Sequence, residues 1–302
     1  MNGAISIQGG YAVSVLDEAL GAQRRLWPHY PLEMVGGFDR RWRPAEKFFA
    51  DHGSIEELLV LQDKALPGLD RKGKAAFAIG AYSYALAAGL VPLFVGFRVV
   101  PDFSASNLAV AFAPAGPSRL RFALTRTNIA TDAASPHPNG SDVLEMSSAA
   151  LRDRFSAQLE EHICPLIESL HLATRLGRAA LWRLVADYFA QLFLDAGDQF
   201  HRTRRSQADA MGILKRARSS LSNPQLHFFD LAEENRAIKP CRSELRRTFV
   251  SRGGCCRQYT VDGYELCATC VLQNPEARDI EIRKQLRAAA GLEMAEHGLP
   301  RG

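Results

Sequence analysis

Four of the chain's six cysteines fall within sixteen residues near its C-terminal end, and this grouping constrains the fold more than any other feature. They follow the pattern C-C-x10-C-x2-C and are Cys255, Cys256, Cys267 and Cys270. The C-x2-C half predicts a tight turn whose two sulfurs converge. Adjacent cysteines point to opposite faces of an extended chain, so both can bind one centre only if the backbone turns sharply. We expect the preceding pair of glycines, 253 and 254, to allow that turn, because glycine adopts conformations that other residues resist.

Clustered cysteines in a chain without a secretory leader are typical of metal or redox chemistry rather than of a disulfide framework. Four thiolates are the usual ligands of a [2Fe–2S] cluster. They also bind structural zinc, but zinc ribbons usually pair two C-x2-C units. A thiol–disulfide role for Cys267 and Cys270 would leave the adjacent pair unexplained. Cys164 and Cys241 are isolated, so we expect neither to be a ligand and Cys164 to be a small core residue.

Composition limits the classes of function. With 47% hydrophobic and 23% charged residues, the chain of 302 residues is typical of a soluble globular protein. A net charge of +4 is too small to indicate a nucleic-acid partner, although it allows capture of an anionic small molecule or an acidic protein. Residues 75–97 are uncharged but interrupted by Gly89 and Pro92, and a membrane span needs roughly 20 continuous apolar residues. We predict a buried helix that runs into a strand, and no transmembrane span.

The order of apolar patterns predicts an α+β fold that is mainly helical. Periodicity indicates amphipathic helices at 12–26, from Ser54 to 66, 147–172, 176–196, 207–221 and 275–290. Runs rich in Phe, Val and Leu at 93–100, 107–113 and 119–125 predict a small antiparallel sheet in the N-terminal half. Residues 131–142 are rich in Pro, Asn and Gly and are predicted to be a loop. We expect residues 1–240 to form an α+β body that binds substrate, with residues 241–302 as a C-terminal cluster segment packed on it.

The cysteine motif and its surroundings resemble the FhuF-like ferric-siderophore reductases. The basic lead-in Arg246-Arg247-Thr248, the Cys-Cys-Arg-Gln-Tyr continuation and the Leu181-Trp182 helix opening are also similar. The resemblance implies a [2Fe–2S] cluster on the four cysteines that reduces ferric siderophores, typically hydroxamates, by one electron and releases Fe(II) for iron assimilation. It implies a C-terminal iron–sulfur module in a cytoplasmic protein, either free or peripheral to the inner membrane. Its partners would be the ferric siderophore and an electron donor such as a ferredoxin or another cellular reductant.

Three residues near the motif are candidates for tuning the cluster's reduction potential. Arg252 and Arg257 are the nearest cations in sequence, and cations close to an anionic cluster favour its reduced form. The alternative is that these arginines are solvated or pair with acidic residues. Tyr259 is a candidate shield for the cluster, with core packing as its alternative.

The sequence offers weaker signals for the siderophore pocket and for other functions. Arg40, Arg41, Trp42, Arg43 and Lys47 are a candidate cationic, aromatic wall, with a solvated loop as the alternative. A cluster-bearing redox sensor would need a partner surface, and the sequence shows no helix-turn-helix signature. A zinc-stabilised binding module would be colourless. No ATP-binding signature is present, which disfavours siderophore synthesis.

Overall fold

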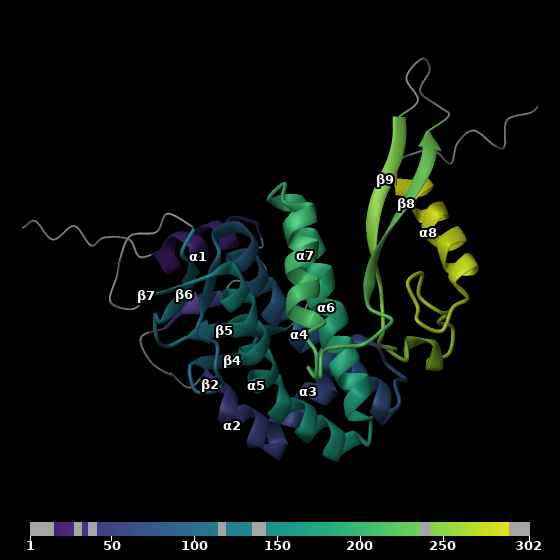
Figure 1. Ribbon diagram of the computed structural model, residues 1–302. Helices are drawn as coiled ribbons and strands as arrows, with labels where there is room; N and C mark the ends of the chain where they lie inside the picture. The colour runs from purple at the N-terminus through teal and green to yellow at the C-terminus, as the bar shows by residue number, and fades with distance from the viewer. Residues whose placement is uncertain are drawn as a thin grey trace, which may run out of the picture.

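The computed structural model describes residues 15–26, 32–35, 41–113, 119–134, 143–235 and 243–289 (Figure 1). Its helices are α1 (Val15–Leu26), α2 (Ala45–Ala50), α3 (His52–Ala65), α4 (Arg71–Phe97), α5 (Ser148–Thr174), α6 (Arg178–Gln199), α7 (Thr203–Leu214), the short 3-10 turn η1 (Gln258–Thr260) and α8 (Pro275–Ala289). Its strands are β1 (Leu32–Met34), β2 (Arg43–Pro44), β3 (Val99–Pro101), β4 (Leu108–Phe112), β5 (Leu120–Leu124), β6 (Ile129–Asp132), β7 (Val143–Met146), β8 (His227–Asn235) and β9 (Ser243–Ser251). The fold is therefore α+β and mainly helical, as predicted.

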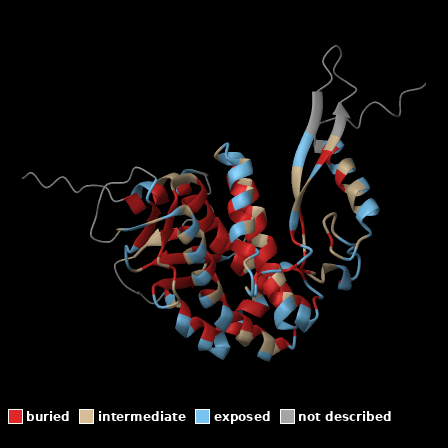
Figure 2. Cartoon of the chain, viewed as in Figure 1, coloured by how far each residue is buried: buried red, intermediate tan, exposed pale blue. Residues whose placement is uncertain are grey.

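Helix α4 lies at the centre of the body, between α6 and the strands around β5 (Figures 1 and 2). It begins after Asp70, whose carboxylate accepts a hydrogen bond from the N–H of Gly73 at 2.6 Å. Within the described ranges α4 is the one helix long and apolar enough to cross a membrane, and 89% of its most apolar window is buried inside the protein. The predicted buried helix is confirmed, and its apolar length reflects its place in the core.

The predicted break at Pro92 is wrong, because α4 continues through it to Phe97. Proline has no N–H, so the carbonyl of Ala88, four residues earlier, lacks its normal helical donor. The buried side chain of Gln23 on α1 donates to that carbonyl instead, with Nε2 3.0 Å from the oxygen. A side chain from another helix thus replaces the missing bond, and the predicted strand at 93–100 shrinks to β3.

The sheets are mixed rather than antiparallel. Strands β4 and β5 pair antiparallel as predicted, with Val110 opposite Phe122. However, β1 joins β5 in parallel, and β6 joins β7 in parallel, giving the orders β1-β5-β4-β2 and β3-β6-β7. Parallel partners are joined by long crossovers, so the local alternation of side chains does not reveal them. The prediction of a purely antiparallel sheet is therefore wrong.

Two helix predictions are corrected by local contacts. Helix α3 begins at His52 rather than at Ser54, because Asp51 is its N-cap and accepts a hydrogen bond from the Ser54 N–H at 2.9 Å. Cys164 is exposed rather than part of the core. It lies one position beyond Ile163 on α5, outside the buried helical stripe that also contains Leu166. By contrast, Ser147 caps α5 as predicted, and α8 matches its predicted range within one residue.

The predicted loop at 131–142 also needs correction. Its first two residues belong to β6, and residues 135–142 lie outside the described ranges. Asp132, a residue that favours turns, is buried in this strand because Arg98 neutralises it, with Nε 3.3 Å from Oδ2. A buried ion pair thus allows a strand where the sequence indicates a loop.

The hairpin β8–β9 is a feature that the sequence did not indicate. It projects beside α7 and is covered on one side by α8 (Figure 1). Ile282 and Leu286 of α8 pack against Leu231 of β8. The expected boundary between residues 240 and 241 falls in the connection between the two strands, outside the described residues. The division into body and cluster segment stays a prediction.

Candidate metal centre

The four clustered cysteines lie on one loop, residues 252–274, which joins β9 to α8 at the edge of the body (Figure 1). The predicted tight turn is present: the Cys270 N–H donates to the Cys267 carbonyl at 2.8 Å, and the Gln273 N–H donates to the Cys270 carbonyl at 3.1 Å. Cys255, Cys256 and Cys267 are partly exposed, whereas Cys270 is buried. The loop therefore brings both halves of the motif to one place near the surface.

The thiols of Cys256 and Cys267 are in direct contact and share a hydrogen bond. Donation from Cys267 lowers the pKa of Cys256 to about 5 and raises the pKa of Cys267, and burial adds to the latter increase. Burial also raises the pKa of Cys255. Metal ligation requires thiolates, and one proton shared between two thiols favours a thiolate in this pair.

The surroundings of the thiols fit an anionic cofactor. Within the described ranges no three Cys, His, Asp or Glu side chains converge closely enough to hold one metal ion. However, Arg252 Nη1 lies 3.8 Å from Cys267 Sγ, and its Nη2 is buried with no acceptor among the described residues. A buried N–H normally has a partner, and an anionic centre on these thiolates would supply one. A loop with four thiols, two of them beside an unsatisfied guanidinium, suits a [2Fe–2S] cluster.

Asp187 of α6 holds the backbone that leads into Cys255, a role that sequence reasoning missed. Its two carboxylate oxygens accept hydrogen bonds from the N–H groups of Gly253 and Gly254, each at 2.8 Å. Its Oδ2 also lies 3.5 Å from Arg252 Nε. Burial raises the pKa of Asp187 to about 6, although the Arg252 charge and the two N–H donors oppose the increase. The available signal was a carboxylate on the apolar side of a predicted helix, since buried charges are paired.

The two glycines before the cysteines serve close packing rather than an unusual turn, which corrects the expectation for them. Neither has a positive φ. A Cβ on Gly254 would lie 2.9 Å from the backbone nitrogen of Leu184, and one on Gly253 would collide with Asn223. The residue with left-handed backbone is Arg257, at φ 64°, directly after the adjacent cysteines. Glycine is therefore needed here because α6 approaches the loop closely.

The three tuning candidates lie in different environments. Arg252 is mostly buried against the thiols and its guanidinium lies 6.0 Å from the centre of the Tyr188 ring. Arg257 instead pairs with Asp70 at 2.7 Å and links the loop to the start of α4. Tyr259 is 40% exposed, which excludes core packing, the alternative to its role as a shield; that role stays a prediction. The aromatic ring near the thiols is the partly buried Tyr188, whose pKa is raised by burial and by the charges of nearby cysteines.

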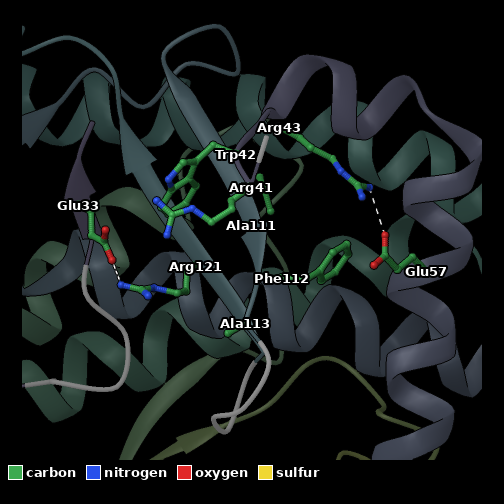
Figure 3. Close-up of a pocket in the computed structure, with 10 residues that line it drawn as sticks. Glu33, Arg41, Trp42, Arg43, Glu57, Ala111, Phe112, Ala113 and Arg121 are labelled. Carbon is green, nitrogen blue, oxygen red and sulfur yellow. Dashed lines mark hydrogen bonds and ion pairs between the residues drawn. The ribbon is translucent and has the colours of Figure 1, made fainter. Parts of the chain in front are cut away.

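The predicted cationic wall forms part of a pocket of about 560 Å³ on the β2–β4–β5 side of the body (Figure 3). Arg41, Trp42 and Arg43 line it, whereas Arg40 is outside the described residues and Lys47 lies on α2. The Arg43 guanidinium already pairs with Glu57 at 3.2 Å. In Figure 1 strands β2 and β4, which carry residues that line this pocket, lie on the opposite side of the α4–α6 pair from the β9–α8 connection that carries the cysteines. The wall and the thiols therefore do not form one site.

Comparison with known families gives two matches. Residues 79–235, more than half of the chain, match the family described as "Ferric iron reductase FhuF-like transporter". Residues 252–272 match the FhuF 2Fe-2S C-terminal domain, and this range contains all four clustered cysteines together with Arg252 and Arg257. No individual curated protein matches the chain.

Proposed function

The chain belongs to the FhuF-like ferric iron reductase family and carries that family's [2Fe–2S] cluster, and from this premise we propose that it reduces Fe(III) bound in a hydroxamate siderophore. The reaction adds one electron to the iron and releases it as Fe(II) in the cytoplasm. Hard oxygen ligands hold ferric iron much more tightly than ferrous iron. One electron therefore loosens the complex without breaking any covalent bond of the siderophore.

The proposed ligands of the cluster are Cys255, Cys256, Cys267 and Cys270. Support comes from the donor set itself, since four thiolates are the usual ligands of this cluster. The cluster, when bound, stores the single electron that a cellular reductant supplies and the ferric iron accepts. The match to a 2Fe-2S domain over the same residues favours this cofactor over structural zinc.

The partial exposure of Cys255, Cys256 and Cys267 is the observation that carries the proposal. Transfer of an electron between two metal centres requires close approach, not an enclosed pocket with acid and base groups. The cysteine loop meets this requirement because it lies at the surface at the edge of the body. A bulky ferric complex can therefore approach the thiols directly.

The neighbouring residues adjust the charge around the thiols. Arg252 lies against Cys267 and favours an additional negative charge there, which raises the reduction potential. Asp187 limits this effect because it pairs with the same guanidinium. Arg257 contributes less, since Asp70 already neutralises its side chain.

Rapid mixing of the reduced holoprotein with ferric hydroxamates tests the proposal. The protein is reduced with dithionite without oxygen, freed of excess reductant and mixed with ferric desferrioxamine and a Fe(II) chelator. We expect the visible absorbance of the cluster to return to its oxidised form while one Fe(II) is trapped per cluster. Each ~59 mV of unfavourable potential is a factor of ten in equilibrium, which efficient trapping of Fe(II) overcomes.

Two controls separate the alternatives. The protein with Cys164→Ser should react as the wild type does, because Cys164 lies on α5 outside the loop. A reduced cluster that no ferric siderophore reoxidises, with the chelator present, would contradict the proposal. That result would favour the redox-sensor alternative.

A further inference from the structure

Exposed apolar side chains gather on the cysteine loop. Four large ones lie there and are between 36% and 53% exposed: Tyr259, Tyr264, Leu266 and Leu272. Together with Glu265 and Gln273 they line a hollow of about 680 Å³, here named the loop hollow. Large apolar groups gathered in solvent mark a surface that binds something.

The loop hollow is next to the proposed ligands. Leu266 directly precedes Cys267, and Leu272 follows Cys270 by two residues. The turn from Cys267 through Cys270 to Gln273, closed by successive backbone hydrogen bonds, joins the two sides of the hollow. A molecule bound there lies within a few residues of two of the four sulfurs. Strands β2 and β4, which carry residues of the arginine-lined pocket, lie on the other side of α4 and α6 (Figure 1).

The lining of the hollow has a distinct chemistry. Among its described lining residues there is one carboxylate, Glu265, and no lysine or arginine. This surface suits a compact chelate with apolar arms and no net negative charge, and it repels a strongly anionic chelate.

We propose that the loop hollow is the site where the ferric siderophore binds, and that its charge excludes trianionic iron complexes. The proposal rests on the proposed function and adds the location of the substrate and its permitted charge. A volume of about 680 Å³ is within the range of small-molecule sites. Docking of an electron-donor protein at this surface is an alternative that the variants below distinguish.

The experiment separates binding from reduction. Binding of gallium(III) desferrioxamine to the oxidised holoprotein is measured by calorimetry, because gallium has the size and charge of ferric iron but accepts no electron under these conditions. Reduced protein is then mixed with the ferric complex over a range of concentrations. The half-saturating concentration and the limiting rate are recorded separately. Ferricyanide serves as an oxidant that needs no binding pocket.

The variants Leu272→Asp and Tyr264→Ser change the hollow without touching a cysteine. The matched control is Leu172→Asp on α5, since Leu172 is 62% exposed and outside the loop. We expect Leu272→Asp to raise both the gallium dissociation constant and the half-saturating ferric concentration at least tenfold. Tyr264→Ser should raise them less. The limiting rate and the cluster absorbance should stay at wild-type values, as should the reaction of the uncharged variant Tyr264→Ser with ferricyanide and every property of the control.

Several results would overturn the proposal and leave the proposed function standing. One is that Leu272→Asp and Tyr264→Ser bind gallium desferrioxamine as tightly as the wild-type protein, while ferric desferrioxamine reoxidises the wild-type cluster normally. Loss of binding in Trp42→Ala would then assign the substrate to the arginine-lined pocket. Equal binding of a gallium tricatecholate of charge −3 would overturn the charge selection. If Leu272→Asp slowed only the reduction of the cluster by a protein donor and left siderophore binding unchanged, the hollow would be assigned to that donor. If wild-type protein reacts with no ferric siderophore, the proposed function fails first.

Discussion

The body and the cysteine loop of this protein are stabilised by different interactions. In the body, large side chains such as Phe94, Phe155 and Phe193 are completely buried between helices. In residues 252–289 the buried apolar side chains among those described are few, namely Val261, Cys270, Ile282 and Leu286. Ordering each residue costs about 1–2 kcal/mol, whereas burying one aliphatic side chain contributes about 1.5–3 kcal/mol. Apolar burial alone therefore fixes the body but not the loop.

The loop is instead attached at a few points. Asp187 binds the backbone at its start, and Arg257 pairs with Asp70. Val261 packs on Leu66 and Leu69 near the start of α4. These attachments lie before Cys267. After it, Ala268 packs on the small cluster of Leu231, Ile282 and Leu286, and Arg252 contacts the Cys267 thiol. We therefore expect the second half of the motif to depend more on the proposed ligation than the first half does.

The largest expected effect comes from removing a proposed ligand. Cys267→Ser should abolish the visible absorbance of the cluster and the hydrogen-exchange protection of residues 264–273. Amides of α4 and α6 should keep their protection, because their burial does not involve the loop. Cys164→Ser should change nothing. Loss of hydrogen-exchange protection in α4 would contradict the separate stabilisation of body and loop and would show that they fold as one unit.

Removing the carboxylate of Asp187 is expected to have the next largest effect. Asp187→Ala leaves two backbone N–H groups and the Arg252 guanidinium without their acceptor, and breaking a buried pair costs about 3–5 kcal/mol. Cluster loss in urea, followed by absorbance, should therefore occur at a much lower concentration. Asp187→Asn keeps an acceptor oxygen and should recover part of the loss. Asp198→Asn, at the exposed end of α6, is the matched control.

The third effect concerns the body alone: we expect its stability to fall at low pH because of a buried histidine. His162 is fully buried, its Nε2 lies 2.8 Å from the Tyr82 hydroxyl, and burial lowers its pKa from 6.5 to about 3. Below pH 6.5 the unfolded chain binds a proton that the folded body does not, so stability falls as the pH decreases towards 3. At about 1.4 kcal/mol per pH unit, the loss reaches about 3 kcal/mol near pH 4.

Chemical denaturation of the metal-free protein, followed by circular dichroism, measures this loss. His162→Phe should flatten the stability profile between pH 6.5 and pH 4 relative to the wild type. His52→Gln should not, because the His52 side chain is 80% exposed. An unchanged slope in His162→Phe would show that other groups determine the acid sensitivity of the body.

The smallest expected effect concerns Arg257. Its ion pair with Asp70 is partly exposed, and such pairs contribute about 0–1 kcal/mol. Arg257→Gln should therefore leave the cluster bound and lower its reduction potential only slightly, as followed by spectroelectrochemistry. Arg252→Gln should lower the potential more, because Arg252 is buried against Cys267. If Arg257→Gln lowered the reduction potential more than Arg252→Gln, closeness in sequence to the cysteines, not burial, would determine how strongly each arginine affects the potential.

The cofactor, the family and much of the secondary structure could be predicted from the sequence. The C-C-x10-C-x2-C spacing indicated the cofactor and the family, and the family matches confirm both. Local signals also predicted the buried stretch of α4, the Ser147 cap of α5 and the extent of α8. These features could be predicted because they depend on residues within a few turns of one another.

Only the tertiary structure decided how the site is supported. Asp187 is 66 residues from Gly253, and Asp70 is 187 residues from Arg257, so no local pattern pairs them. The same reason explains the parallel strands, and Gln23, which binds the carbonyl that Pro92 leaves without a donor, is 65 residues from Ala88. A buried polar group needs a partner, but the partner's identity depends on which elements the folded chain brings together.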